Sequence, residues 1–199
     1  MLQPAFVRSV FLKAKELSLT TCLDTSGHGN KEMWDTCLPA TDYVMLCLKG
    51  MDLNLASFLS GVPKVHSMRA REFAKHIRDN YKYVKLSLRW VLLKDMTDTD
   101  EEINALAQFA KELNPVFTHI ELLPVSYHQH YCQYFFVYLS FNLHYRWLNL
   151  QYHDLGKEKY SMIGLDYALD DMEPYKYEDA LKVQEKLRNL GIPATLAEH

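Results

Sequence analysis

The sequence predicts an α/β protein built on a parallel sheet, and three observations support this class. Short apolar runs alternate with amphipathic stretches, the connections are long enough for crossover helices, and polar residues gather where the runs end. Strands joined by such crossovers align in parallel with right-handed connections. With 199 residues, 48% of them hydrophobic and 24% charged, the chain is expected to form a single domain.

The expected elements follow one another in order. An amphipathic helix begins at Pro4, and a capping box at residues 99–102 opens a later helix that runs to Leu113. Gly191 can close the last helix as a C-cap. The expected strands cover residues 19–25, 42–48, 83–93, 117–123 and 192–196, and the other expected helices cover residues 31–38, 68–81 and 178–190.

Charge and hydropathy exclude several classes of function. A net charge of -3 and the lack of a Lys/Arg cluster argue against nucleic-acid and anionic-membrane partners. No apolar run reaches the roughly 18 residues that a membrane helix needs. The amino terminus is basic and amphipathic, but it leads straight into a strand, so a domain helix is favoured over a mitochondrial presequence. A cytoplasmic location is expected, with an organelle as the alternative.

The four cysteines do not form a local metal motif. Cys22, Cys37, Cys47 and Cys132 match neither C-x2-C nor C-x3-C-x2-C spacing, so we expect no iron–sulfur ligands among them. Cys22 and Cys47 fall inside predicted buried strands, where a free thiol acts as a small apolar side chain.

Polar side chains at several strand ends suggest one shared ligand site, since ligands bind at the carboxyl ends of parallel strands. Asp24 and Thr25 end the first strand, Lys49 follows the second, and Arg89 lies within the third. Arg89 needs a buried partner in its apolar strand, whereas Lys49 before a glycine could equally be a solvated turn lysine.

Residues 125–151 interrupt the pattern. The segment is rich in aromatic residues, and Arg146 is its only charged residue. Val125-Ser126 matches an in-frame splice donor and Gln151 an acceptor, so a retained intron is the favoured interpretation. A genuine unstructured insertion is the alternative. The least favoured interpretation is a metal site formed by His128, His130, Cys132 and His144.

Seven motifs in order resemble the glycyl-radical-enzyme activases of the radical S-adenosylmethionine superfamily, and they span nearly everything outside 125–151. The longest uninterrupted one is Thr21-Cys22-Leu23-Asp24-Thr25-Ser26-Gly27. The others are Leu2-Gln3-Pro4 through Val7, Asp42 to Lys49, Arg69-x-x-Glu72-Phe73-Ala74, Arg89-x-Val91, Ile120-Glu121-Leu122-Leu123-Pro124 and Tyr152-His153-x-Leu155-Gly156-x-x-Lys159.

The resemblance implies an incomplete (β/α)6 partial TIM barrel over residues 1–199 that lacks the first strands. In such enzymes a [4Fe–4S] cluster reductively cleaves S-adenosylmethionine, and the resulting radical takes hydrogen from a glycine of a partner enzyme. Pyruvate formate-lyase is the partner expected from the Asp24 and His153 motifs, with flavodoxin or ferredoxin as electron donor.

The resemblance also implies residue roles. Lys49, Arg89 and His153 would bind S-adenosylmethionine. Asp24, Thr25 and Met45 would form a monovalent cation site, weakened because Cys47 replaces an acidic residue of the family.

Some family features are missing from the sequence. The cluster-binding C-x3-C-x2-C and the Gly-Gly-Glu motif would lie before Met1, and Lys94-Asp95 replaces a Pro-Gly turn. We therefore expect a truncated radical enzyme that is inactive alone. The alternatives are a non-catalytic barrel fragment that binds a partner protein, or an aldolase with Lys49 as Schiff-base nucleophile.

Overall fold

The structure, a computed structural model, describes residues 3–124, 162, 164 and 173–197. The segment 125–151, together with Cys132 and His153, lies outside these residues. In chain order the elements are α1 (Pro4–Glu16), β1 (Cys22–Thr25), α2 (Lys31–Cys37), η1 (Leu38–Ala40), β2 (Tyr43–Leu48), α3 (Leu53–Ser60), α4 (Lys64–Ser67), α5 (Arg69–Asn80), β3 (Lys85–Leu92), α6 (Asp100–Glu112), β4 (Phe117–Pro124), α8 (Tyr177–Asn189) and β5 (Ala194–Leu196).

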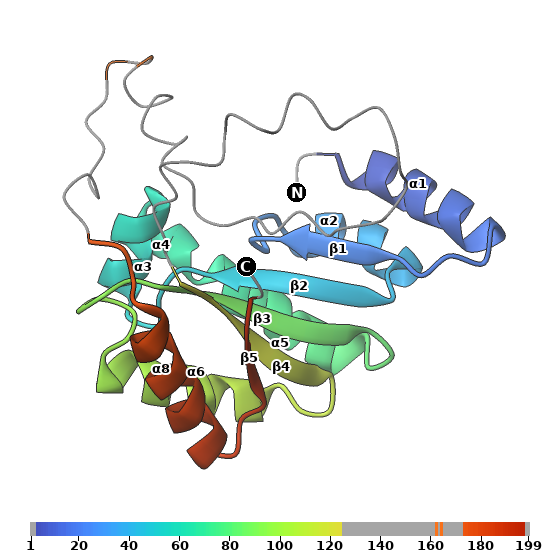
Figure 1. Cartoon of the computed structure of the whole chain (residues 1–199). Coiled ribbons are helices and arrows are strands. Elements are labelled where there is room, and N and C mark those ends of the chain that lie inside the picture. Colours follow the sequence, from blue (N-terminus) through green and yellow to red (C-terminus); the bar gives the residue numbers. More distant parts are fainter. Residues whose placement is uncertain (1–2, 125–161, 163, 165–172, 198–199) are drawn as a thin grey trace, which may run out of the picture.

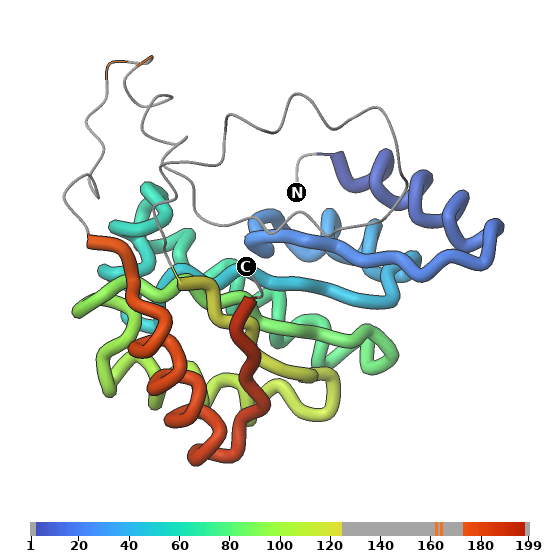
Figure 2. The backbone as a smooth tube through the Cα atoms, in the orientation of Figure 1, coloured from blue at the N-terminus to red at the C-terminus, as the bar shows by residue number. Residues whose placement is uncertain are grey.

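The described strands form one parallel sheet in the order β1-β2-β3-β4-β5 (Figure 1). Strands that follow one another in the chain lie side by side, as the tube in Figure 2 traces from blue to red. A sequential order of parallel strands is that of a barrel wall. β1 forms one edge, and within the described residues no strand pairs with its outer side. The predicted α/β class with a parallel sheet is confirmed.

Helices cover one face of the sheet and build the core there. Alternate strand residues such as Leu46, Leu88 and Ile120 are fully buried on that face, because successive side chains of a strand point to opposite sides. They pack in one cluster with apolar residues of α2, α5, α6 and α8, among them Trp34, Phe73, Leu106 and Leu187. Apart from the buried Ser87, the intervening strand residues are half-buried or exposed, which leaves the opposite face to carry polar side chains.

The expected elements lie within a few residues of the observed ones, but α3 and α4 were not predicted. The signals for α3 are nevertheless in the sequence. The Asp52 side chain accepts hydrogen bonds from the backbone N–H groups of Asn54 and Leu55, and Gly61 closes α3 with a left-handed φ of 67°.

The predicted capping box at α6 forms only in part. The Thr99 hydroxyl caps the helix by accepting from the Glu102 backbone N–H at 3.3 Å. The Glu102 carboxylate instead turns to the backbone of Met51 and Asp52, so the reciprocal bond to Thr99 is replaced by a contact between two elements.

Helix α1 lies beside α2 at the edge of the molecule and buries little of its apolar stripe. Val7 and Phe11 pack against the core, whereas Phe6, Val10 and Leu17 are exposed. No helix in the described ranges is long and apolar enough to cross a membrane.

In the turn after β3, Lys94-Asp95 stands where the resemblance leads one to expect Pro-Gly. Asp95 adopts a left-handed φ of 59°, a conformation that Asp tolerates better than most side chains. Thr97 stabilises this turn, because its hydroxyl accepts from the Leu93 N–H at 2.8 Å and donates to the Val91 carbonyl at 2.7 Å.

Candidate functional site

The open face of the sheet carries a row of polar side chains at neighbouring register positions. Cys47 of β2 pairs in register with Arg89 of β3, and Arg89 pairs with Glu121 of β4. Asp24 of β1 pairs with Met45 of β2. These residues therefore share one face, opposite the helices, near the carboxyl ends of the strands.

Arg89 is the centre of this row. Its Nε donates to Glu121 Oε2 at 2.7 Å, and its Nη1 donates to Asp24 Oδ2 at 3.0 Å. Only 12% of the Arg89 side chain is exposed, compared with 40% for Asp24 and 29% for Glu121. Burial alone would lower the pKa of Arg89, but Glu121, Cys47 and Asp24 outweigh it and raise the pKa. The guanidinium thus holds two carboxylates in fixed positions, one of them across the intervening strand β2.

Cys47 lies between these charges. Burial raises the pKa of its thiol, which keeps it neutral near pH 7. A thiol at this position therefore adds no negative charge to the pair of carboxylates.

Lys49 lies just beyond the end of β2 and is exposed. It lines a cavity of about 340 Å³ between the loop after β1 and the helices α3 to α5. The polar lining comes from Ser26, His28, Cys47, Lys49, Ser60 and Ser67, and the apolar lining from Leu48, Ala56, Leu59, Val62 and Ala70. Within the described part of the chain, no hydrogen bond or ion pair holds the Lys49 ammonium, so it is available to an anionic group.

The turn after β1 brings the loop close to α5. The Thr25 hydroxyl accepts from the Gly27 N–H at 3.1 Å, and Gly27 has a left-handed φ of 73°. A Cβ at Gly27 would lie 3.0 Å from the Cα of Ala70. Both the conformation and the close approach therefore require glycine.

Replacing Gly27 with alanine should lower the free energy of unfolding by about 2–3 kcal/mol, because left-handed strain adds to a clash with backbone. Gly61→Ala is the matched control, since Gly61 has a similar φ of 67° but no atom within 4 Å of the added Cβ. It should cost only about 1 kcal/mol. Urea unfolding of both variants measures the difference, and equal losses would contradict the close approach to Ala70.

The structure brings together several of the residues predicted for the site. Asp24 contacts Arg89, and Met45 lies beside Asp24 in register. Lys49 directly follows the strand that contains Met45, and it lines the cavity together with Cys47. Thr25 uses its hydroxyl in the turn. His153 lies outside the described residues, and the roles of all these residues remain predictions.

Sequence reasoning gave no role to Glu121, the closer of the two partners of Arg89. The sequence does carry a signal, because Glu121 is an acid within the apolar run Ile120–Pro124, as Arg89 is a base within another apolar run. Two opposite charges in neighbouring strands of one sheet are candidates for a cross-strand pair.

The prediction that Cys22 and Cys47 are buried strand residues is wrong. Both lie on the open face of the sheet, where Cys22 is exposed and Cys47 is half-buried. The buried thiol is that of Cys37, which donates to the Pro4 carbonyl at 3.1 Å. Successive side chains of a strand point to opposite faces of the sheet, and the helices cover only one face. Every second residue therefore lies on the open face, whatever its polarity.

The described cysteines do not fit an iron–sulfur cluster. Cys22 pairs in register with Tyr43, four positions before Cys47, so the two thiols are separated by roughly 13 Å along the strands. Cys37 lies in α2, on the helix-covered side. In the described ranges, no group of three His, Cys, Asp or Glu side chains could hold a metal ion.

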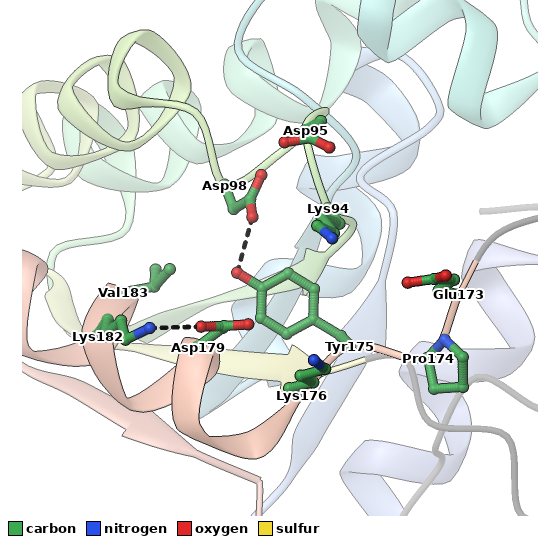
Figure 3. A pocket seen from close by; sticks show the side chains of 10 residues that line it. All are labelled: Lys94, Asp95, Asp98, Glu173, Pro174, Tyr175, Lys176, Asp179, Lys182 and Val183. Carbon is green, nitrogen blue, oxygen red and sulfur yellow. Dashed lines mark hydrogen bonds and ion pairs between the residues drawn. The ribbon is translucent and has the colours of Figure 1, made fainter.

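A second cavity of about 300 Å³ lies between the turn after β3 and the start of α8 (Figure 3). Asp98, Asp179 and Lys182 of its charged lining make internal contacts. The Tyr175 hydroxyl donates to Asp98 at 2.8 Å, and Lys182 pairs with Asp179 at 2.7 Å. Burial and the neighbouring Asp98 raise the pKa of Tyr175, which keeps its proton as a donor to Asp98. The Tyr175 contact joins the segment just before α8 to the turn that follows the Arg89 strand.

Solved structures of other proteins share this fold, among them the following two. The crystal structure of a domain of pyruvate-formate lyase-activating enzyme from Bacteroides vulgatus ATCC 8482 superposes with a TM-score of 0.67 at 16% identity, covering 99% of this chain and 92% of that one. A radical SAM methyltransferase from Sphaerobacter thermophilus gives a TM-score of 0.52 at 16% identity, covering 91% of this chain and 42% of that one. The sheet and its helices therefore share the partial-barrel fold of these two proteins.

Sequence comparison finds similar proteins among the curated pyruvate formate-lyase activating enzymes. The chain is 32% identical over 193 residues to the pyruvate formate-lyase 1-activating enzyme of Escherichia coli (strain K12), covering 96% of this chain. This similarity agrees with the family that the motifs predicted. The match spans 65% of the length of that relative. No protein-family model matches the chain.

Proposed function

We propose that the open face of the sheet binds S-adenosylmethionine and that the chain takes part in activating a glycyl-radical enzyme, pyruvate formate-lyase. The single observation that carries this proposal is the Asp24–Arg89–Glu121 ion-pair group, whose charges act together with that of Lys49 on the intervening Cys47. The names of the relatives supply the partner enzyme.

The charges suit the ligand. S-adenosylmethionine carries a carboxylate together with a sulfonium and an ammonium. Lys49 would hold the carboxylate, because its ammonium has no described partner. Arg89 would position the carboxylates of Asp24 and Glu121 toward the cationic methionyl group, and its remaining N–H groups could reach the ligand carboxylate.

Further roles rest on the family resemblance. Asp24, Thr25 and Met45 would hold a monovalent cation beside the methionyl group, with Cys47 supplying no charge. His153 would donate a hydrogen bond to the ligand. Flavodoxin or ferredoxin would be the electron donor, and the reaction would take place in the cytoplasm, with an organelle as the alternative.

Bound S-adenosylmethionine would supply the radical that removes hydrogen from the partner's glycine, after electron transfer from an iron–sulfur cluster. The described cysteines do not fit that cluster. The role proposed for the described residues is therefore to bind and orient S-adenosylmethionine. A non-catalytic fragment that binds a partner protein is the second candidate, favoured by the scattered cysteines and by Cys47 in place of an acid.

Binding of S-adenosylmethionine to the full chain, measured by isothermal titration calorimetry, tests the proposal. We expect saturable binding that weakens about tenfold in Lys49→Met, because one ion pair in a half-shielded site is lost. S-adenosylhomocysteine, which lacks the sulfonium charge, should bind more weakly than S-adenosylmethionine.

Lys31→Met is the control, since Lys31 is an exposed lysine of α2 that does not line the cavity. It should leave the affinity unchanged. A chain that binds neither compound would contradict the proposal and favour the non-catalytic fragment. Equal changes in affinity for S-adenosylmethionine in Lys49→Met and Lys31→Met would do the same.

A further inference from the structure

The carboxylate of Glu102 fixes the loop that follows Lys49. Its Oε2 accepts from the Met51 backbone N–H at 2.6 Å, and its Oε1 accepts from the Asp52 backbone N–H at 2.7 Å. Glu102 is only 6% exposed, and it stands in the first turn of α6, about fifty residues further along the chain. A buried carboxylate that uses both oxygens on one loop holds that loop in a single conformation.

Two other contacts hold the same loop. Arg71 of α5 donates from Nη1 to the Met51 carbonyl at 3.1 Å. Gly50 is buried against the start of α3, where an added Cβ would lie 3.0 Å from the Ala56 nitrogen. The loop is thus fixed from α3, α5 and α6 together.

Lys49 lies between two fixed points. On one side, Leu48 ends β2 in register with Trp90 of β3, and on the other, Met51 is bound by Glu102. The Lys49 backbone therefore has little freedom, although its side chain is exposed beside the cavity. A preorganised backbone limits where the Lys49 ammonium can reach.

We propose that Glu102 is a positioning residue that sets the place of Lys49 at the ligand site. This inference rests on the proposed function of Lys49 in binding S-adenosylmethionine. A carboxylate suits the task because it accepts at both oxygens. Glutamine of the same shape would turn an amide N–H₂ toward one backbone N–H and leave that donor unpaired.

Amide hydrogen exchange in the Glu102→Gln variant tests whether the Glu102 carboxylate fixes the loop after Lys49. We expect the amides of Met51 and Asp52 to exchange about tenfold faster than in the wild type. Glu101→Gln is the matched control, because Glu101 is the exposed neighbour in the same helical turn. Unchanged exchange at Met51 and Asp52 in a folded Glu102→Gln chain would overturn the proposal.

A double-mutant cycle separates positioning from a general structural role. Glu102→Gln should weaken binding of S-adenosylmethionine about tenfold in the wild-type background and have little effect in the Lys49→Met background. Equal effects in both backgrounds would overturn the proposal, because Glu102 would then act without Lys49.

If the chain binds no S-adenosylmethionine, the proposed function is contradicted. The positioning of Lys49 by Glu102 can still be tested without the ligand. The chain is acetylated without a ligand, with a limiting amount of an amine-reactive acetyl ester, and the products are analysed by peptide mass spectrometry. The rate of acetylation at Lys49 then reports how accessible and reactive its amine is. Glu102→Gln should change the rate at Lys49 relative to Lys31, and Glu101→Gln should not. An unchanged rate in Glu102→Gln would overturn the positioning role.

Discussion

Replacing Arg89 with methionine is expected to lower the free energy of unfolding by about 2–3 kcal/mol. Methionine keeps much of the side-chain volume but leaves the carboxylates of Asp24 and Glu121 without the cation that joins them. The loss falls short of that for a fully buried pair, because 40% of the Asp24 side chain is exposed and solvent screens its charge. The same variant should weaken binding of S-adenosylmethionine by at least about tenfold, since the two carboxylates lose their fixed positions.

Urea unfolding measures this stability change, and a second variant tests its cause. Arg89→Met leaves two carboxylates unpaired, and adding Glu121→Gln removes the charge of the closer one. The double variant should therefore regain part of the lost stability. Arg89→Lys keeps the charge but cannot make both bonds in the same geometry, and it should fall between the wild type and Arg89→Met. A loss below about 0.5 kcal/mol in Arg89→Met would mean that the ion-pair group is only a surface feature.

The periodicity of the sequence was sufficient to predict the sheet. Strand runs with β-branched and apolar residues alternate with helices, and all five described strands appear where these runs lie. The expectation that Arg89 needs a partner also agrees with its two ion pairs. Desolvation supplies the reason, because a cation inside an apolar strand is costly unless a carboxylate faces it.

Other features depended on contacts between distant segments. Glu102 fits a capping box by its spacing, yet its carboxylate binds the backbone of Met51 and Asp52, which no local pattern indicates. Cys22 and Cys47 looked buried because their runs are apolar, but only the packing of the helices decides which strand face is covered. The Asp24–Arg89 contact likewise needs the strand order, because β2 lies between the two strands.

The strand that carries Arg89 is anchored from its other face by Trp90, and Trp90→Ala is expected to cost about 3–5 kcal/mol. Trp90 is fully buried in the core, and its indole N–H donates to the Thr97 carbonyl at 3.0 Å. Thr97 in turn stabilises the turn after β3 through Leu93 and Val91. Alanine would leave a cavity and free this turn, and the loss is a large part of the 5–15 kcal/mol typical of a domain.

Trp90→Phe separates packing from hydrogen bonding. Phenylalanine fills much of the same space but leaves the Thr97 carbonyl without its donor, so the cost should be only about 1–2 kcal/mol. Urea unfolding followed by circular dichroism is suitable, because removing a tryptophan alters the fluorescence signal itself. If the two substitutions cost the same, the hydrogen bond to Thr97 would be the main contribution, and the packing argument for this side of β3 would be wrong. A larger loss in Trp90→Ala, with the affinity of Trp90→Phe for S-adenosylmethionine unchanged, would show that the buried face supports the strand while the open face provides the site.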